Sequence, residues 1–185
     1  MGRQLRRARV AVAALALVLR VGALAGQSAT TWFAGGGLSL PAGDFSVYAN
    51  TGWGVVGGLE HRLGTHLTAL RVDLSYATNG DTTALGFHET THLLSALASL
   101  VYHFDGAHPH LYALVGAGYF SRRFSSDDPE DIPIDDGHFA IQLGEGLIFR
   151  VRSATIFAEG RFVTSLGPGP FRYFPVVVGV RLGGH

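Results

Sequence analysis

The chain has 185 residues, of which 26 are Gly and none is Cys or Lys, and its 14 Arg balance 14 acidic residues. A hydrophobic content of 47% with 11% aromatic residues excludes a disordered chain, and the absence of Cys excludes a disulfide scaffold or a thiolate metal site. Charged residues make up only 15%, against about 25% in an ordinary soluble domain. This combination favours many strands with a large apolar surface.

The first 25 residues have the pattern of a secretory signal peptide. Four Arg lie within residues 1–9, an apolar run covers Val10–Leu19, and small residues follow at Ala23 and Ala25. Ten apolar residues are too few to span a bilayer core of about 30 Å as a helix, so a transmembrane anchor is the weaker alternative.

Removal of residues 1–25 takes away five Arg and leaves a net charge of −5. A mildly acidic chain lacks the basic face that nucleic acids require.

The remaining chain, residues 26–185, is predicted to form one domain of eight strands. Alternation of apolar and polar residues, interrupted by Gly, Pro, Asp and Asn, indicates the strands. They are expected at Thr31–Leu40, Trp53–His61, Thr65–Tyr76, Thr90–His103, His110–Phe120, His138–Arg150, Thr155–Val163 and Tyr173–Leu182. All have nine or more residues, which suits a membrane-spanning strand better than a soluble one.

The predicted connections alternate between long and short. Long connections are expected at 41–52, 77–89, 121–137 and 164–172, and short ones at 62–64, 104–109 and 151–154. An up-and-down barrel in an outer membrane has long extracellular loops and short periplasmic turns. The pattern therefore predicts an eight-stranded antiparallel transmembrane β-barrel, with no transmembrane helix.

Alternation along each strand assigns the two faces. Leu70, Val72 and Leu74 share one face, while Arg71 and Asp73 lie on the other. Periodicity alone does not separate a membrane barrel from a soluble sandwich, but strand length, loop alternation and the signal peptide favour the membrane. Aromatic residues near strand ends are expected to form interfacial belts: Trp32, Trp53, Tyr76, Tyr102, Tyr119, Phe139, Phe149, Tyr173 and Phe174.

Five segments, in this order and spacing, resemble the small eight-stranded outer-membrane barrels of the OmpA/OmpX type, the "outer membrane protein beta-barrel domain" families of Gram-negative bacteria. The segments are Gly36–Phe45, Ala69–Tyr76, Pro109–Tyr119, Phe157–Phe162 and Phe174–Leu182. The resemblance implies an outer-membrane location, contact with membrane lipid and lipopolysaccharide, and insertion by the barrel-assembly machinery. The sequence departs from the family at Leu182, where a terminal aromatic residue is common.

Charged residues on the polar face predict an ion-pair network inside the barrel. Three acids and three Arg fall on this face: Glu60, Arg71, Asp73, Glu159, Arg161 and Arg181, with Gln142 and Arg150 beside them. Side chains fill the interior of an eight-stranded barrel. The principal expectation is a structural plug, and the alternative is a narrow gated pore or a small-ligand cavity.

A cluster of acids marks the third long connection, Ser121–Gly137. It contains Asp127, Asp128, Glu130, Asp131, Asp135 and Asp136. The spacing does not match the twelve-residue Ca²⁺-binding loop, so a solvated surface loop is expected. The alternative is a loop that bridges through divalent cations to lipopolysaccharide phosphates.

Glu145 conflicts with the barrel pattern. Alternation places it among Ile141, Leu143, Leu147 and Phe149 on the lipid side, where a carboxylate is disfavoured. We expect a β-bulge that turns Glu145 inward, and a contact with another protomer is the alternative.

No catalytic or cofactor site is predicted. The groupings nearest to a nucleophile and base, His88, Glu89 and His92 with Ser95, or His138 with Asp135, match no known barrel-enzyme motif. We expect a non-enzymatic barrel with a structural or surface-interaction role, such as membrane integrity or adhesion. The alternatives are a narrow pore or ligand-transport barrel and, less favoured, a soluble lipocalin-like barrel.

Overall fold

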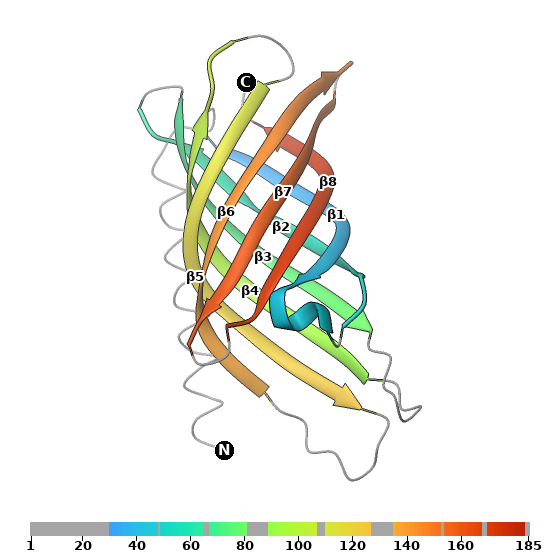
Figure 1. The fold of residues 1–185 in the computed structure, drawn as a ribbon. Coiled ribbons are helices and arrows are strands. Elements are labelled where there is room, and N and C mark those ends of the chain that lie inside the picture. Colours follow the sequence, from blue (N-terminus) through green and yellow to red (C-terminus); the bar gives the residue numbers. More distant parts are fainter. Residues whose placement is uncertain are drawn as a thin grey trace, which may run out of the picture.

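The protein is a closed barrel of eight antiparallel strands in which each strand pairs with its neighbours in sequence and the last pairs with the first (Figure 1). The computed structural model describes residues 30–47, 49–64, 67–80, 89–106, 110–126, 135–152, 154–167 and 170–183. The predicted signal peptide lies outside these ranges. The predicted fold class is confirmed.

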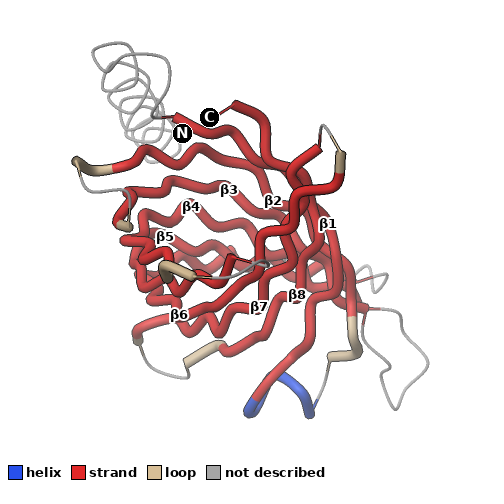
Figure 2. Tube along the Cα trace, turned by 90° about the horizontal axis from the view of Figure 1, so that it is seen from above, coloured by secondary structure: helices blue, strands red, loops and turns tan. Residues whose placement is uncertain are grey.

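All eight predicted strands are present. Their bounds are β1 Thr30–Ala42, β2 Gly52–Arg62, β3 Thr68–Gly80, β4 Glu89–His103, β5 His110–Ser126, β6 Asp135–Val151, β7 Ala154–Leu166 and β8 Arg172–Gly183. A short 3-10 helix, η1 (Gly43–Val47), follows β1 and lies beside β1 and β8, as Figure 2 shows. No helix in the described ranges is long and apolar enough to span a bilayer.

Strands β5 and β6 are longer than predicted. Residues 121–123 and 135–137, assigned to a loop from sequence, continue the β5–β6 ladder, and residues 124–126 continue the ladder with β4. The connection between β5 and β6 therefore comprises 127–134. Asp135 and Asp136 therefore belong to β6 and not to the loop. One physical reason is the pairing of Arg122 with Asp136 opposite each other on the two strands, because opposite charges at facing positions stabilise a ladder.

The barrel is inverted relative to a soluble domain, with apolar side chains outside and charged ones inside. On β3, Leu70 and Leu74 are exposed, whereas Arg71 and Asp73 are fully buried in the lumen. The same alternation holds on β7 and β8. An apolar exterior is stable only where lipid surrounds it.

Two aromatic belts surround the outer face. The turn end of the barrel, where β1 begins and β8 ends, carries Trp32, Tyr102 and Phe149, and the opposite loop end carries Trp53, Tyr76, Tyr119, Phe139 and Phe174. Tyr173 was expected in a belt but is only 3% exposed and faces inward. Its register opposite Val163, which is also buried, sets this orientation.

Inside the barrel, aromatic rings lie over glycines on the neighbouring strand. Phe33 is opposite Gly58, Phe157 is opposite Gly179 and Tyr112 is opposite Gly146. A Cβ atom at Gly146 would lie 2.4 Å from the Tyr112 ring. The glycines therefore provide the room that large rings need in a narrow lumen, a use of Gly also known from designed barrels.

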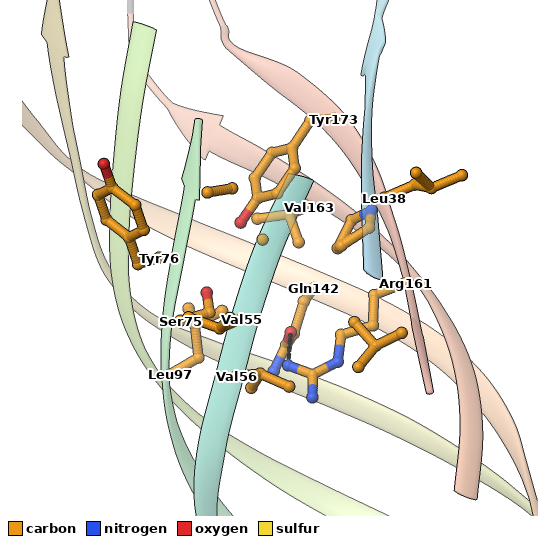
Figure 3. A pocket seen from close by; sticks show the side chains of 14 residues that line it. Leu38, Val55, Val56, Ser75, Tyr76, Leu97, Gln142, Arg161, Val163 and Tyr173 are labelled. Atoms are coloured by element: carbon orange, nitrogen blue, oxygen red, sulfur yellow. Dashed lines mark hydrogen bonds between the residues drawn. The ribbon is translucent and has the colours of Figure 1, made fainter. Parts of the chain in front are cut away.

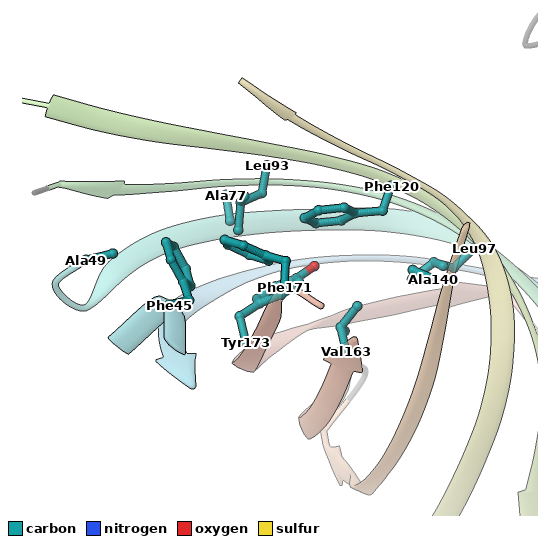
Figure 4. Packing of buried hydrophobic residues seen from close by; sticks show 10 residues of the cluster. All are labelled: Phe45, Ala49, Ala77, Leu93, Leu97, Phe120, Ala140, Val163, Phe171 and Tyr173. Carbon is teal, nitrogen blue, oxygen red and sulfur yellow. The ribbon is translucent and has the colours of Figure 1, made fainter. Parts of the chain in front are cut away.

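An apolar cluster closes the lumen near the loop end. Phe45 of η1 packs on Phe171 with ring centroids 3.9 Å apart, and Phe120 and Tyr173 complete the aromatic group (Figure 4). Phe171 is held by a hydrogen bond that its backbone N–H donates to Ser165 Oγ over 2.8 Å. The 3-10 helix thus positions a side chain that helps to seal this end.

The bulge predicted at Glu145 is absent. The β5–β6 register runs without a break through Ala113 opposite Glu145, and the β6–β7 register does so through Gly160 opposite Glu145. Glu145 is exposed on the outer face. The prediction was wrong because both neighbouring ladders stay continuous, which leaves no extra residue to rotate the carboxylate inward.

Candidate functional site: the lumen network

The six charged residues predicted on the polar face come from four strands and meet inside the barrel. Glu60 lies on β2, Arg71 and Asp73 on β3, Glu159 and Arg161 on β7, and Arg181 on β8. In a ring of eight strands, β3 and β7 lie on opposite walls. The Arg71–Glu159 and Arg161–Asp73 pairs therefore cross the lumen.

Arg71 is the centre of the network. Its Nε and Nη2 donate to Glu60 Oε2 over 3.1 and 2.8 Å, and its Nη1 donates to Glu159 Oε2. The guanidinium also lies over the rings of Phe33 and Tyr112, with centroid distances of 4.6 and 5.1 Å. These contacts offset the loss of hydration of the guanidinium group, because Arg71 is fully buried.

Glu60 has further partners toward the turn end. Its Oε1 accepts a hydrogen bond from Arg181 Nη2 over 2.5 Å and lies 3.0 Å from His103 Nε2. Two arginines and a histidine thus surround one buried carboxylate. This arrangement satisfies the carboxylate without water.

Arg161 organises the part of the network nearer the loop end. Its Nη1 donates to Asp73 Oδ1 over 2.8 Å and to Gln142 Oε1 over 3.3 Å, while its Nε donates to Glu159 Oε1. Gln142 Nε2 in turn donates to Ser99 Oγ over 2.7 Å. Figure 3 shows Arg161 and Gln142 directed at each other beneath Tyr173.

The lumen beside this network has very little free space. A cavity of about 20 Å³ is lined by Arg161, Gln142, Ser75, two tyrosines and apolar residues, which is room for about one water molecule. Within the described ranges, Asp73 Oδ2 and Arg161 Nη2 are buried without a hydrogen-bond partner. The cavity is too small for an organic ligand.

A wider vestibule of about 210 Å³ opens at the turn end. Arg62 and Arg150 line it together with His103 and Arg181, both of which also contact Glu60. Arg150, predicted on the lumen face, is exposed at this rim. The vestibule therefore ends at the ion-pair network.

The predicted acidic loop is only partly described. Asp127, Asp128, Glu130 and Asp131 lie outside the described ranges, and Asp135 is placed only as part of the β6 backbone. Asp136 Oδ2 accepts a hydrogen bond from Arg122 Nη2 over 3.3 Å. Within the parts of the chain that the structure covers, no three His, Asp or Glu side chains gather as metal ligands.

The catalytic grouping of His92 with Ser95 does not form. His92 lies outward with its Nδ1 2.8 Å from the Tyr76 hydroxyl, whereas Ser95 is buried 2.6 Å from Ser75 Oγ. An interval of three residues places two side chains on opposite faces of a strand.

Sequence reasoning missed two members of the network. Tyr112 donates its hydroxyl to Glu159 Oε2 over 2.6 Å, and His103 contacts Glu60. Strand alternation places both residues on the inner face, so this signal was available. The sequence of one strand does not show, however, which charged residue of another strand a Tyr or His will contact.

An exterior of apolar side chains between two aromatic belts, around a charged and filled lumen, defines a transmembrane β-barrel of the outer-membrane type. The model of the family described as "Outer membrane protein beta-barrel domain" matches residues 11–155. The chain belongs to this family, and its location is the outer membrane. The soluble lipocalin-like alternative is therefore wrong, and the turn end faces the periplasm.

Solved structures of small outer-membrane barrels share the fold. Neisserial surface protein A is 16% identical, with 83% of this chain and 96% of that chain covered and a TM-score of 0.57. Ail, the attachment invasion locus protein of Yersinia pestis, is 14% identical over 83% and 97%, with a TM-score of 0.52. The N-terminal β-barrel domain of Pseudomonas aeruginosa OprF is 19% identical over 85% and 100%, with a TM-score of 0.51. A comparison with curated protein sequences found no match.

Proposed function

We propose that the protein is a closed, non-enzymatic barrel that supports the outer membrane and acts through its surface, and that it does not conduct solutes. The observation that carries this proposal is the Arg71–Glu60–Glu159–Arg161–Asp73 network, whose side chains join opposite walls of the lumen. A conducting path would have to separate these buried pairs, and a buried charge without its partner is strongly destabilising. The aromatic cluster around Phe171 adds a second barrier.

Planar-bilayer recording tests the closed state. The folded protein, identified by a shift between unboiled and boiled samples on an SDS gel, is expected to give no stepwise conductance in 1 M salt. A general porin inserted in the same bilayers serves as the positive control. Reproducible conductance steps from the folded fraction would overturn the proposal in favour of the narrow pore, the alternative function.

The outer surface of the barrel supports contact with lipopolysaccharide through divalent cations. The sequence between β5 and β6 carries four acids, Asp127, Asp128, Glu130 and Asp131. The nearby Arg122 already pairs with Asp136 and lies over the Phe124 and Phe171 rings. Ail was solved with the heparin analogue sucrose octasulfate. The acidic segment between β5 and β6 would repel a directly bound polyanion such as sucrose octasulfate. It favours instead a contact in which divalent cations bridge its carboxylates to lipopolysaccharide phosphates.

Divalent-cation titration tests this contact. In lipopolysaccharide bilayers, Mg²⁺ is expected to raise the unfolding midpoint by roughly 2–4 °C, the shift that about 1 kcal/mol produces in a chain of this size. A variant with D127N, D128N, E130Q and D131N should lose the shift, while D105N at the turn end should keep it. An equal Mg²⁺ shift in the neutralised variant, or none in the wild type, would refute the contact.

A further inference from the structure

Glu145 is the one ionisable residue between the two aromatic belts on the outer face of the described strands. It lies on β6 between the outward residues Leu143 and Leu147, and both neighbouring ladders keep their register past it. On the other seven strands, the outward positions between the belts are Ala, Gly, Val, Leu, Ile or Phe, and Thr164 on β7 lies at the level of the loop-end belt. An ionisable group inside a membrane is a functional-site candidate by default.

Glu145 lies well inside the hydrocarbon layer. It is four residues from Phe149 in the turn-end belt and six from Phe139 in the loop-end belt. With a rise of about 3.4 Å per residue and a strand tilt of about 40°, its Cα is roughly 10 Å deeper than that of Phe149. The short side chain of Glu does not span this distance to water.

The carboxyl group has no partner among the residues that the structure describes. In the described ranges Glu145 has no hydrogen bond or ion pair with another residue. Its facing residues are Ala113 on β5 and Gly160 on β7, and the ring of Phe174 on β8 lies over Gly160. On the β5 side the small side chain of Ala113 leaves the carboxyl group open, and small residues allow a second surface to approach closely.

A partner for this group must present a polar atom at the same depth. All copies of an outer-membrane protein insert in one orientation, so a two-fold axis between two copies is parallel to the membrane normal, and equivalent residues meet at equal depth. At the depth of Glu145, the outward residues on the other described strands are apolar or Gly. The group that this barrel offers there is a second Glu145.

We propose that the β5–β6–β7 face is a dimer interface between two copies of this chain, in which the two Glu145 carboxyl groups meet near the two-fold axis. At least one of the two is protonated, and its O–H donates to a carboxyl oxygen of the other copy. The contact replaces two unpartnered groups in lipid with one hydrogen-bonded pair. It also explains why the strand retains an acid at a position where Leu would suit a monomer.

Cross-linking in lipid vesicles tests the interface, because the chain has no Cys. A single L143C, on β6 beside Glu145, is treated with a short bis-maleimide and compared with V55C on β2 at the opposite wall. Leu143 and Val55 are 58% and 49% exposed on the lipid-facing surface, so the bis-maleimide is a membrane-permeant one and each yield is expressed relative to single-site labelling of the same variant. Protein is diluted to a low ratio to lipid, and folding of each variant is checked by the shift between unboiled and boiled samples.

L143C is expected to give a cross-linked dimer and V55C only the background of random collisions. Adding E145L to L143C should lower the dimer yield about tenfold, which corresponds to about 1.4 kcal/mol of association free energy. E145Q, whose amide also pairs with itself, should retain most of the yield. If E145L does not fold, E145A serves the same purpose.

Three results would overturn the proposal. The first is an L143C yield no higher than that of V55C. The second is an unchanged yield when the carboxyl group is removed by E145L or E145A. The third is cross-linking of L143C to a different protein in native outer membranes with no dimer in purified vesicles, which would assign the face to another partner.

Discussion

Arg71→Met is expected to lower the free energy of unfolding by about 3 kcal/mol, within the roughly 3–5 kcal/mol that removal of one partner from a buried ion pair costs. The substitution keeps an unbranched apolar side chain under the Phe33 and Tyr112 rings but removes the donors to Glu60 and Glu159. We expect a loss of stability near the lower limit of this range, because Glu60 still forms an ion pair with Arg181 and Glu159 still forms one with Arg161.

Urea unfolding in lipid vesicles, followed by the fluorescence of the two Trp residues, measures this loss. Arg62→Met is the matched control, because Arg62 is exposed at the end of β2 and forms no ion pair within the described ranges. Its effect should stay within about 0.5 kcal/mol, as for ordinary surface substitutions. Equal effects of the two substitutions would mean that the lumen network contributes nothing specific to stability.

Gly146→Ala is expected to destabilise the barrel by at least about 2 kcal/mol, although it adds one methyl group. The added Cβ would lie 2.4 Å from the Tyr112 ring, and Tyr112 is fully buried. Overpacking costs about 1–3 kcal/mol. Displacing the ring also weakens its hydrogen bond to Glu159, and a bond to a charged group is worth roughly 1.5–3 kcal/mol.

Gly57→Ala is the control for Gly146→Ala, since Gly57 faces outward and the nearest atom to an added Cβ is 3.7 Å away. We expect it to be neutral or slightly stabilising, by about 0.5–1 kcal/mol, because Ala restricts the unfolded chain more than Gly. The same urea titrations compare the two. A Gly146→Ala variant as stable as Gly57→Ala would show that the ring can move aside without loss.

The lumen residues illustrate how far sequence alone reaches. A period of two placed Glu60, Arg71 and Arg161 on one face, because successive side chains of a strand point to opposite sides. Glu60 and Arg71 are also facing partners in the β2–β3 ladder. The contact of Arg71 with Glu159 joins strands that are not neighbours, and it depends on the stagger and closure of the whole barrel.

Strand boundaries and special positions were less predictable. The ends of β5 and β6 depended on cross-strand pairs such as Arg122 and Asp136, which no single strand reveals. The inward position of Tyr173 depended on its register opposite Val163, and the absence of a bulge at Glu145 depended on continuous registers with β5 and β7. The aromatic ring of Tyr173 suggested an outward position and the carboxylate of Glu145 suggested an inward one. In both cases the continuous hydrogen-bonded ladders fix the opposite orientation.

The sequence by itself determined the class of protein: eight long alternating strands, an apolar exterior and charges facing inward, because these follow from local periodicity and composition. The tertiary structure decided which charges pair across the lumen, which glycines lie beneath aromatic rings, and that no bulge turns Glu145 away from lipid. These depend on the closed register of all eight strands, in which each ladder constrains the next, and no local pattern contains that information.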